Sequence, residues 1–229
     1  SAANQPPTVT LTSPASNAVY QALGTISIAA SASDPDGSIA EVKFYNGTNL
    51  LSTDTASPYS YAWAGIAAGS YTLKAVATDN GGLSVTSAPV PVVVNAQPLV
   101  SLISPTNGAT YVVGDAIPIN AAASDTDGTI SQVAFYDGAA LLSTDTTSPY
   151  GYSWTNAALG SHALYAIAAD NRGGSALSST TTVTVVTPVP VLTVVPTNFN
   201  VQVLAGQDAA SSTFTVANTG SGTLNYTIA

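Results

Sequence analysis

Hydrophobic and polar residues alternate with a period of two over short stretches of the chain. In residues 39–45, Val42 and Phe44 fall on one side of an extended backbone, while Glu41 and Lys43 fall on the other. Such alternation predicts β-strands with one face toward a core and the other toward solvent. No stretch sustains the period of an amphipathic helix. The pattern therefore predicts an all-β fold.

Similar stretches recur about every ten residues in the first 95 residues, and turn-forming Pro, Gly and Asn residues separate them. About seven short strands at this spacing are typical of a β-sandwich. We expect strands at 8–12, 25–33, 39–45, 49–55, 59–65, 70–78 and 84–94.

The chain contains an internal repeat with an offset of 91 residues. "LLSTDTASPYSYAW" (50–63) aligns with "LLSTDTTSPYGYSW" (141–154), and the alignment needs no gap. A unit of this length is the size of a domain, whereas solenoid repeats are much shorter. We therefore predict two copies of one sandwich, followed by a segment that breaks the repeat. The expected divisions are a tail at 1–5, domains at 6–95 and 96–187, and a partial third β domain at 188–229.

The last segment has only about four expected strands, which is roughly half a sandwich. Half a sandwich exposes an apolar face and free strand edges. We therefore expect that either the natural chain continues beyond Ala229 or strands of an identical subunit complete residues 191–229 in a fibre. Proline in the joints at 95–98 and 187–190 stiffens the backbone, so the tandem domains should form a rod.

The amino-acid composition limits the classes of molecule that the protein could bind. Twelve acidic residues against three basic ones give a net charge of −9, which disfavours nucleic acid and anionic membranes and makes cations the natural counter-species. The chain has no cysteine, so neither a disulfide nor a thiolate metal site is possible. Its apolar runs are too short for insertion into a bilayer. It begins with Ser1 and has no leader pattern, so we expect a mature or excised fragment of a larger extracellular protein.

The strand order resembles a known family. "SDPDGSIAEVKFYNG" (33–47), "SPYSYAW" (57–63) and "AAGSYTLKAVATDNGG" (67–82) look like the bacterial Ig-like domains that occur in tandem in secreted carbohydrate-active enzymes and cell-surface proteins. The resemblance covers residues 6–95 and 98–187 and implies fibronectin-III-like sandwiches. It implies a role as spacer, stabiliser, adhesin or occasional sugar binder. The segment from 191 resembles the start of another bacterial β-sandwich family.

In an Ig-like sandwich the loop between the second and third strands and the loop between the sixth and seventh emerge at the same end. Carboxylates from "SDPDG" and "TDNGG" should therefore converge, with an asparagine nearby. Calcium takes about six to eight oxygen ligands and would suit such a cluster. The alternative is that these side chains only cap their own turns. The predicted metal ligands are Asp34, Asp36 and Asp79 beside Asn80 in the first copy, and Asp125, Asp127 and Asp170 beside Asn171 in the second.

An aromatic stripe occurs once in each copy. Tyr59, Tyr61 and Trp63 share one face of a strand, and their spacing of about 7 Å can match stacked sugar rings. An exposed stripe would be a carbohydrate platform, whereas a buried one would anchor the core. The candidate sugar-binding residues are Tyr59, Tyr61, Tyr150 and Tyr152.

The sequence offers no catalytic constellation. His162 is the only histidine, and the repeat aligns it with Tyr71, where Ig-like domains often place a tyrosine that bonds a neighbouring corner. We therefore expect a substituted corner residue and not a catalytic base. Asp54 and Asp145 should be solvated or cap turns on an edge strand. The overall expectation is a non-catalytic extracellular spacer that presents an enzyme or adhesin module, with calcium as a possible stiffener; the alternatives are a fibre subunit and a carbohydrate-binding module.

Overall fold

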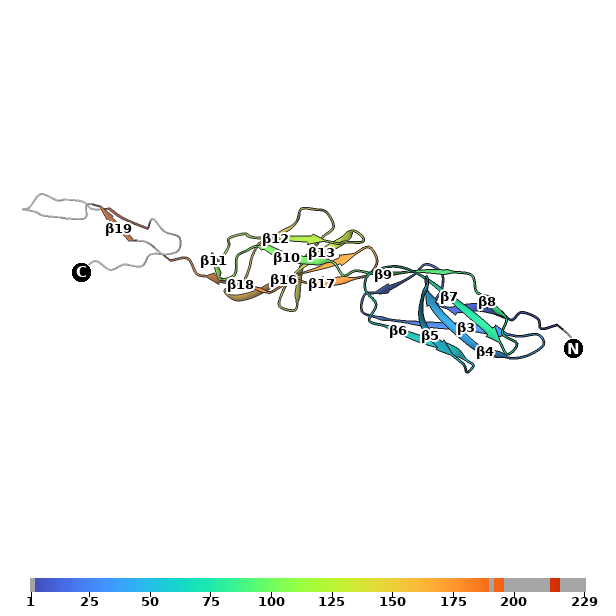
Figure 1. The fold of residues 1–229 in the computed structure, drawn as a ribbon. Coiled ribbons are helices and arrows are strands. Elements are labelled where there is room, and N and C mark those ends of the chain that lie inside the picture. The colour runs from blue at the N-terminus through green and yellow to red at the C-terminus, as the bar shows by residue number, and fades with distance from the viewer. Residues whose placement is uncertain (1–2, 190–191, 196–214, 219–229) are drawn as a thin grey trace, which may run out of the picture.

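The computed structural model describes residues 3–189, 192–195 and 215–218. Within these residues every regular element is a strand, and none is a helix that could cross a membrane. Figure 1 shows two β-sandwiches placed end to end. The all-β fold predicted from the alternating pattern is confirmed.

The first sandwich consists of two sheets that are built from the first nine strands. A three-stranded sheet has the order β1-β3-β6, and a six-stranded sheet has the order β2-β9-β7-β4-β5, with β8 paired to β7. The strands are β1 (Thr8–Ser13), β2 (Ala18–Gln21), β3 (Thr25–Ser33), β4 (Ile39–Asn46), β5 (Asn49–Asp54), β6 (Tyr59–Ala64), β7 (Gly69–Asp79), β8 (Ser84–Thr86) and β9 (Val90–Asn95).

The second sandwich repeats this topology. Its sheets have the orders β10-β12-β15 and β11-β18-β16-β13-β14, with β17 paired to β16. The strands are β10 (Leu99–Ser104), β11 (Ala109–Val112), β12 (Ile117–Ser124), β13 (Ile130–Asp137), β14 (Ala140–Asp145), β15 (Tyr150–Trp154), β16 (Gly160–Asp170), β17 (Ser175–Leu177) and β18 (Thr181–Val186). Beyond it, β19 (Leu192–Val195) and β20 (Thr215–Asn218) form an antiparallel pair. The remainder of the predicted third domain, and with it the proposed fibre contact, lies outside the described residues.

The alternating pattern correctly identified the inward faces. On β4, Val42 and Phe44 are fully buried, and on β7 the buried residues are Leu73, Ala75 and Ala77. They pack against residues of the three-stranded sheet in one apolar cluster between the two sheets. Burial of this apolar surface is the main favourable contribution to folding of each sandwich.

Two strand predictions need correction. The four-residue strand β2 was not expected, and it pairs in parallel with β9. The stretch predicted as one strand at 84–94 is two strands, β8 and β9, which pair with different parts of β7. Between them the Ser87 hydroxyl accepts a hydrogen bond from the Ala75 amide at 3.0 Å, so a side chain replaces a backbone partner there.

Candidate functional site

The loop after β3 and the loop after β7 meet at the N-terminal end of the first sandwich. The side-chain oxygens of Asp34 and Asn80 converge over Gly37, where a Cβ atom would overlap Asn80 Oδ1 and lie 2.6 Å from Asp34 Oδ2. Both carboxylate oxygens of Asp34 are buried and have no hydrogen-bond partner. A buried acceptor without a donor is costly, so a donor or a cation at this carboxylate would be favourable.

The surroundings of Asp34 raise the pKa of its carboxyl group. Burial contributes most, and the negative charges of Asp36 and Asp79 add to it, although the Asp36 amide acts in the opposite direction. A cation bound at this carboxylate would remove the like-charge repulsion that favours the protonated form.

Asp79 has the second of the two predicted roles, because it caps its own turn. It is 2% exposed, its Oδ1 accepts hydrogen bonds from the amides of Gly81 and Leu83, and its Oδ2 accepts one from Asn4 Nδ2 at 3.0 Å. Burial alone would raise the pKa of Asp79, but these donors outweigh it and lower the pKa. Asp79 therefore organises the loop, and its oxygens face donors of the protein.

Asp36 also turns toward the backbone, because both of its carboxylate oxygens accept from the Gln5 amide at 3.1–3.2 Å. In the described part of the chain, no three His, Cys, Asp or Glu side chains are grouped as a metal site would require. The prediction of three converging carboxylates is thus revised to one unpartnered carboxylate, Asp34, beside the amide oxygen of Asn80. The sequence already contained Asn80, but it could not indicate which oxygens the loop amides would occupy.

The second sandwich repeats the arrangement at the equivalent loops. A Cβ atom on Gly128 would overlap Asn171 Oδ1 and lie 2.5 Å from Asp125 Oδ2, which is buried without a partner. Asp125 Oδ1 accepts a long hydrogen bond of 3.4 Å from the Asp127 amide. Asp170 matches Asp79, since it accepts from the amides of Arg172 and Gly174. Burial alone would raise the pKa of Asp170, but the Asn95 side chain and these two amides outweigh it and lower the pKa.

These loops of the second sandwich form the joint with the first. Asn95, at the end of β9, is fully buried, and its Nδ2 donates to Asp170 Oδ2 at 2.7 Å and to Gln21 Oε1 at 3.2 Å. Gln21 Nε2 in turn donates to the Arg172 carbonyl. The Ala96 amide contacts both carboxylate oxygens of Asp127 at 3.3 Å. The two sandwiches are therefore connected by a network of hydrogen bonds and not by a simple linker.

A glycine makes this close approach possible. A Cβ atom at Gly174 would come within 2.7 Å of Asn95 Nδ2 and 3.1 Å of Gln21 Oε1. The repeat places Leu83 at the equivalent position of the first sandwich, where the side chain is 41% exposed. Only the second sandwich has the space that this joint needs.

Residues 7–75 and 98–166 match the family described as "Bacterial Ig domain", and together these ranges are more than half of the chain. The chain belongs to this family. The two matched ranges start in the two copies of the repeat, as the resemblance in the sequence implied. Bacterial Ig domains typically occur in extracellular or surface proteins and are generally non-catalytic.

Among solved structures, the chain is 34% identical to the fibronectin(III)-like modules of CbhA from Clostridium thermocellum, with a TM-score of 0.45. The match covers 79% of this chain and 94% of the CbhA modules. The chain is 10% identical to three N-terminal domains of the highly immunogenic outer capsid protein of bacteriophage RB49, with a TM-score of 0.49 and coverage of 80% and 70%. An I-band fragment of titin is 14% identical, with a TM-score of 0.40 and coverage of 80% and 66%. No curated protein matches the chain.

The aromatic stripe of each bacterial Ig domain faces the core. Tyr59 is 8% exposed and Tyr150 is 9% exposed. Tyr61 and Tyr152 are half-buried and pack against the two apolar clusters, together with the Trp residues that follow them. This placement favours an anchoring role and provides no exposed sugar platform on this stripe.

The corner residue predicted for each Ig domain is present. The Tyr71 hydroxyl donates to the Ala67 carbonyl at 2.8 Å, and His162 Nε2 lies 2.8 Å from the equivalent Ala158 carbonyl. His162 Nδ1 lies 2.7 Å from Asp137 Oδ2. Each ring packs edge-on against the Trp of its own domain. His162 is thus a structural substitute for the tyrosine.

Asp54 and Asp145 cap the turns that follow β5 and β14, as one of the two predicted alternatives had it. Asp54 accepts from the amides of Ala56 and Ser60, and these bonds lower its pKa. Asp145 accepts in the same way from Thr147 and Gly151. Both carboxylates are therefore engaged by backbone donors, as turn-capping side chains are.

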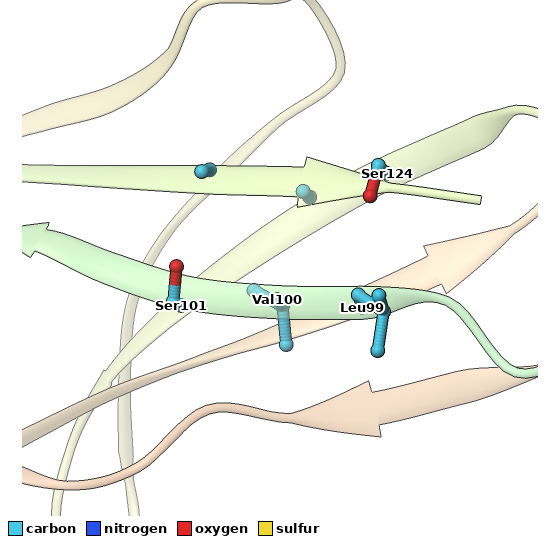
Figure 2. Close-up of a pocket in the computed structure, with 6 residues that line it drawn as sticks. Leu99, Val100, Ser101 and Ser124 are labelled. Atoms are coloured by element: carbon cyan, nitrogen blue, oxygen red, sulfur yellow. The ribbon is translucent and has the colours of Figure 1, made fainter.

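A pocket of about 240 Å³ lies over β10 and β12 of the second Ig domain. Figure 2 shows Leu99 and Val100 on one strand and Ser124 on the other. None of the lining residues is charged, and the full set is Leu99, Val100, Ser101, Ala122, Ala123 and Ser124. The lining includes two serine hydroxyls but no His, Lys, Asp or Glu that could activate either one as a nucleophile.

Proposed function

We propose that the chain is a non-catalytic extracellular spacer that holds another module of a longer protein, such as an enzyme or an adhesin, at a fixed distance. The observation that carries the proposal is the buried polar joint. A flexible tether would need no buried side chain between its domains, whereas here Asn95 is enclosed and bonds both sandwiches. Breaking these bonds would leave the Asp170 carboxylate buried without its side-chain donor, so bending the joint carries a cost.

Calcium is the proposed stiffener at the loop ends. Supporting it are the unpartnered oxygens of Asp34 and Asp125, which lie beside the side-chain oxygens of Asn80 and Asn171 over Gly37 and Gly128. Asp34, Asn80 and nearby carbonyl groups would hold the ion with hard oxygen ligands, as calcium prefers. The bound ion would neutralise the carboxylate and tie the two loops together.

The spacer proposal is tested by small-angle X-ray scattering of the whole chain. The double variant Gln21→Ala with Asn95→Ala should broaden the distribution of interdomain distances, because it removes the side-chain bonds of the joint. The matched control is Asn49→Ala, since Asn49 is an exposed amide on β5. A double variant with the same distance distribution as the wild type would contradict the role of the joint.

The calcium proposal is tested by thermal unfolding with added CaCl₂ and after chelation. A ligand that binds only the folded state raises its stability, so calcium should raise the melting temperature, and Asp34→Asn should reduce the effect. An unchanged melting temperature across the chelator titration would eliminate calcium and leave the spacer proposal standing.

A further inference from the structure

The outward face of the six-stranded sheet differs in charge between the two sandwiches. In the first sandwich it carries three charged side chains, because Lys43 pairs with Glu41 there and Lys74 lies 5.6 Å from the centroid of the Tyr45 ring. The repeat places neutral residues at all three positions of the second sandwich, namely Gln132, Ala134 and Tyr165. The outward positions of β13 and β16, which alternate with the buried ones, are therefore uncharged.

Two tyrosines occupy the centre of this face in the second sandwich. Tyr136 of β13 lies directly opposite Tyr165 of β16 in the antiparallel register. Their rings stack with a centroid distance of 5.1 Å and an interplanar angle of 5°, and both side chains are half-buried. The contact between a lysine and a tyrosine in the first sandwich is thus replaced by a contact between two aromatic rings.

Two exposed leucines flank the tyrosine pair on opposite sides of the sheet. Leu141 of β14 lies opposite Tyr136 and is 56% exposed. Leu177 of β17 lies opposite Ile167 of β16 and is 64% exposed, whereas the repeat places Thr86 at this position of the first sandwich. Residues directly opposite each other in a sheet share one face. These side chains therefore form one apolar patch across four strands, which consists of Tyr136, Leu141, Tyr165, Ile167 and Leu177.

An uncharged patch on an acidic chain suits a second copy of that chain. Each copy has a net charge of −9, so two copies repel each other unless their contact avoids the carboxylates. Contact through the apolar patch buries no charge and places no like charges opposite each other. One face of each tyrosine ring is already covered by the other ring. This arrangement reduces the flat aromatic area on which a sugar could stack and favours a protein partner with aliphatic side chains.

The apolar patch is also complementary to itself. A two-fold axis that lies in the interface and runs along the strands exchanges the two sides of the sheet. With the axis over the tyrosine pair, Leu141 of one copy would lie over Leu177 of the other, and the two tyrosine pairs would meet in the middle. The two flanking leucines lie on opposite sides of the tyrosine pair, on β14 and β17, as this symmetry requires.

We propose that a second copy of the chain docks on the apolar patch of the second sandwich, so that the rods associate laterally in pairs. This inference goes beyond the spacer role and is independent of calcium. Four strands about 4.8 Å apart make the patch roughly 15 Å wide. Such a patch is smaller than the face of about 800 Å² per partner in a standard interface, so the dimer is weak and reversible, with a Kd on the order of 0.1 mM.

The test is sedimentation equilibrium of the whole chain at concentrations that extend above the expected Kd. The wild type should form dimers, and added NaCl should strengthen them, because salt screens the repulsion between two acidic chains. The double variant Tyr165→Lys with Leu177→Thr should weaken the dimer by about tenfold or more, because it places a charge in the interface and removes a leucine.

The repeat supplies the controls for this variant. The first sandwich has Lys74 and Thr86 at the equivalent positions, so both substitutions are compatible with the fold. Thermal unfolding of the double variant checks this point. Ser153→Lys adds the same charge at an exposed position of β15, which belongs to the other sheet, and it should dimerise at least as well as the wild type.

Disulfide cross-linking tests the two-fold arrangement. The chain has no cysteine, so each single substitution introduces the only thiol. Leu141→Cys mixed with Leu177→Cys should form a disulfide between the two variants under mild oxidation, and faster than either variant does with itself. Faster linking of either variant to itself would overturn this docking arrangement.

Three other results would overturn the proposal. They are a wild-type chain that stays monomeric at every concentration, a dimer that the double variant leaves unchanged, and a dimer that NaCl dissociates. If the monomeric wild type is retained on insoluble cellulose and the double variant is not, the apolar patch binds a polysaccharide and not a second copy. None of these results affects the joint between the sandwiches.

Discussion

The first and second sandwiches agree in their interiors and differ at the ends that receive the preceding chain. Phe44 and Phe135 occupy equivalent fully buried positions. At the receiving end, however, the first sandwich has Gly81 and Leu83 where the second has Arg172 and Gly174. In the second sandwich Gly174 leaves room for Asn95 and Gln21 of the neighbouring sandwich, and Arg172 pairs with Asp127. The first sandwich has neither feature at the equivalent positions. Within a repeat, the core maintains the fold while the loops adapt each copy to its place in the chain.

The receiving ends also share one device. Asn4 bonds Asp79 just as Asn95 bonds Asp170, and the amides of Gln5 and Ala96 contact Asp36 and Asp127 in the same way. The segment before each sandwich is therefore part of the repeating unit. The two asparagines differ in burial. The Asn95 side chain is buried and also bonds Gln21 of the adjacent sandwich, whereas Asn4 is exposed.

The largest effect should come from the shared core, and it should be equal in the two copies. Phe44→Ala and Phe135→Ala should each destabilise their own sandwich by about 3–5 kcal/mol through lost burial and the cavity that remains. The chain has two Trp residues, and the aromatic stripe places one in each sandwich. Replacing either Trp with Phe leaves a fluorescence reporter of a single sandwich during urea unfolding. A clearly unequal cost would contradict the equivalence of the two cores.

The joint should give a smaller and unequal effect. Asn95→Ala should destabilise the second sandwich by about 1–3 kcal/mol, because it removes the side-chain donor of the buried Asp170 Oδ2. Asn4→Ala should cost the first sandwich less than about 1 kcal/mol, since Asn4 is exposed and water can replace its bond. Urea unfolding with the single-Trp reporters measures both. Equal free-energy costs would mean that burial of Asn95 by the neighbouring sandwich does not strengthen its bond to Asp170.

The smallest effect should be a pH dependence that His162 gives to the second sandwich. Burial favours neutral His162, but its bonds to Ala158 and Asp137 outweigh burial and raise its pKa above the ordinary value of 6.5. The stabilisation is therefore complete below the unfolded pKa and is lost as pH rises through the folded pKa. The loss should be on the order of 1 kcal/mol, the usual contribution of a hydrogen bond.

Melting curves recorded between about pH 5.5 and about pH 8 test this dependence. The first sandwich, which has Tyr71 at this position, serves as the internal control. His162→Tyr should make the second sandwich equally insensitive to pH. If the melting temperature of the wild-type second sandwich does not change over this pH range, protonation of His162 does not stabilise the domain.

The sequence predicted those parts of the fold that depend on local alternation. The stretch 25–33 matches β3 residue for residue, because a long run of alternating side chains leaves only one face for the core. Strand β2 could not be predicted in the same way. It is four residues long, and its pairing with β9 joins segments more than 70 residues apart.

The break between β8 and β9 is marked in the sequence by a serine that both copies share. Thr180 replaces Pro89 in the second copy, yet β17 and β18 are divided at the same place. Both copies share a serine whose hydroxyl accepts a strand amide, Ser87 in the first and Ser178 in the second. The conformation therefore follows the serine that the two copies have in common.

At the candidate site, the sequence predicted which loops converge but not which carboxylate oxygens the loop amides occupy. The loops do bring Asp34 and Asn80 together, while Asp79 is occupied by amides of its own loop. Residue type cannot reveal this, because a carboxylate accepts equally well from a metal ion or from N–H groups. The recurrence of Asn4 as Asn95, directly before each sandwich, was the visible clue to the joint.

The parallel pairing of β2 with β9 has a mechanical consequence. If the rod is pulled at both ends, tension reaches β9 from the C-terminal side and, once β1 has separated from β3, reaches β2 from the N-terminal side. The two strands are then drawn along their length in opposite directions. Their four registered residue pairs, Ala18 with Val92 through Gln21 with Asn95, are then loaded together in shear and do not open one at a time. The same clamp recurs between β11 and β18, so each sandwich resists extension by itself.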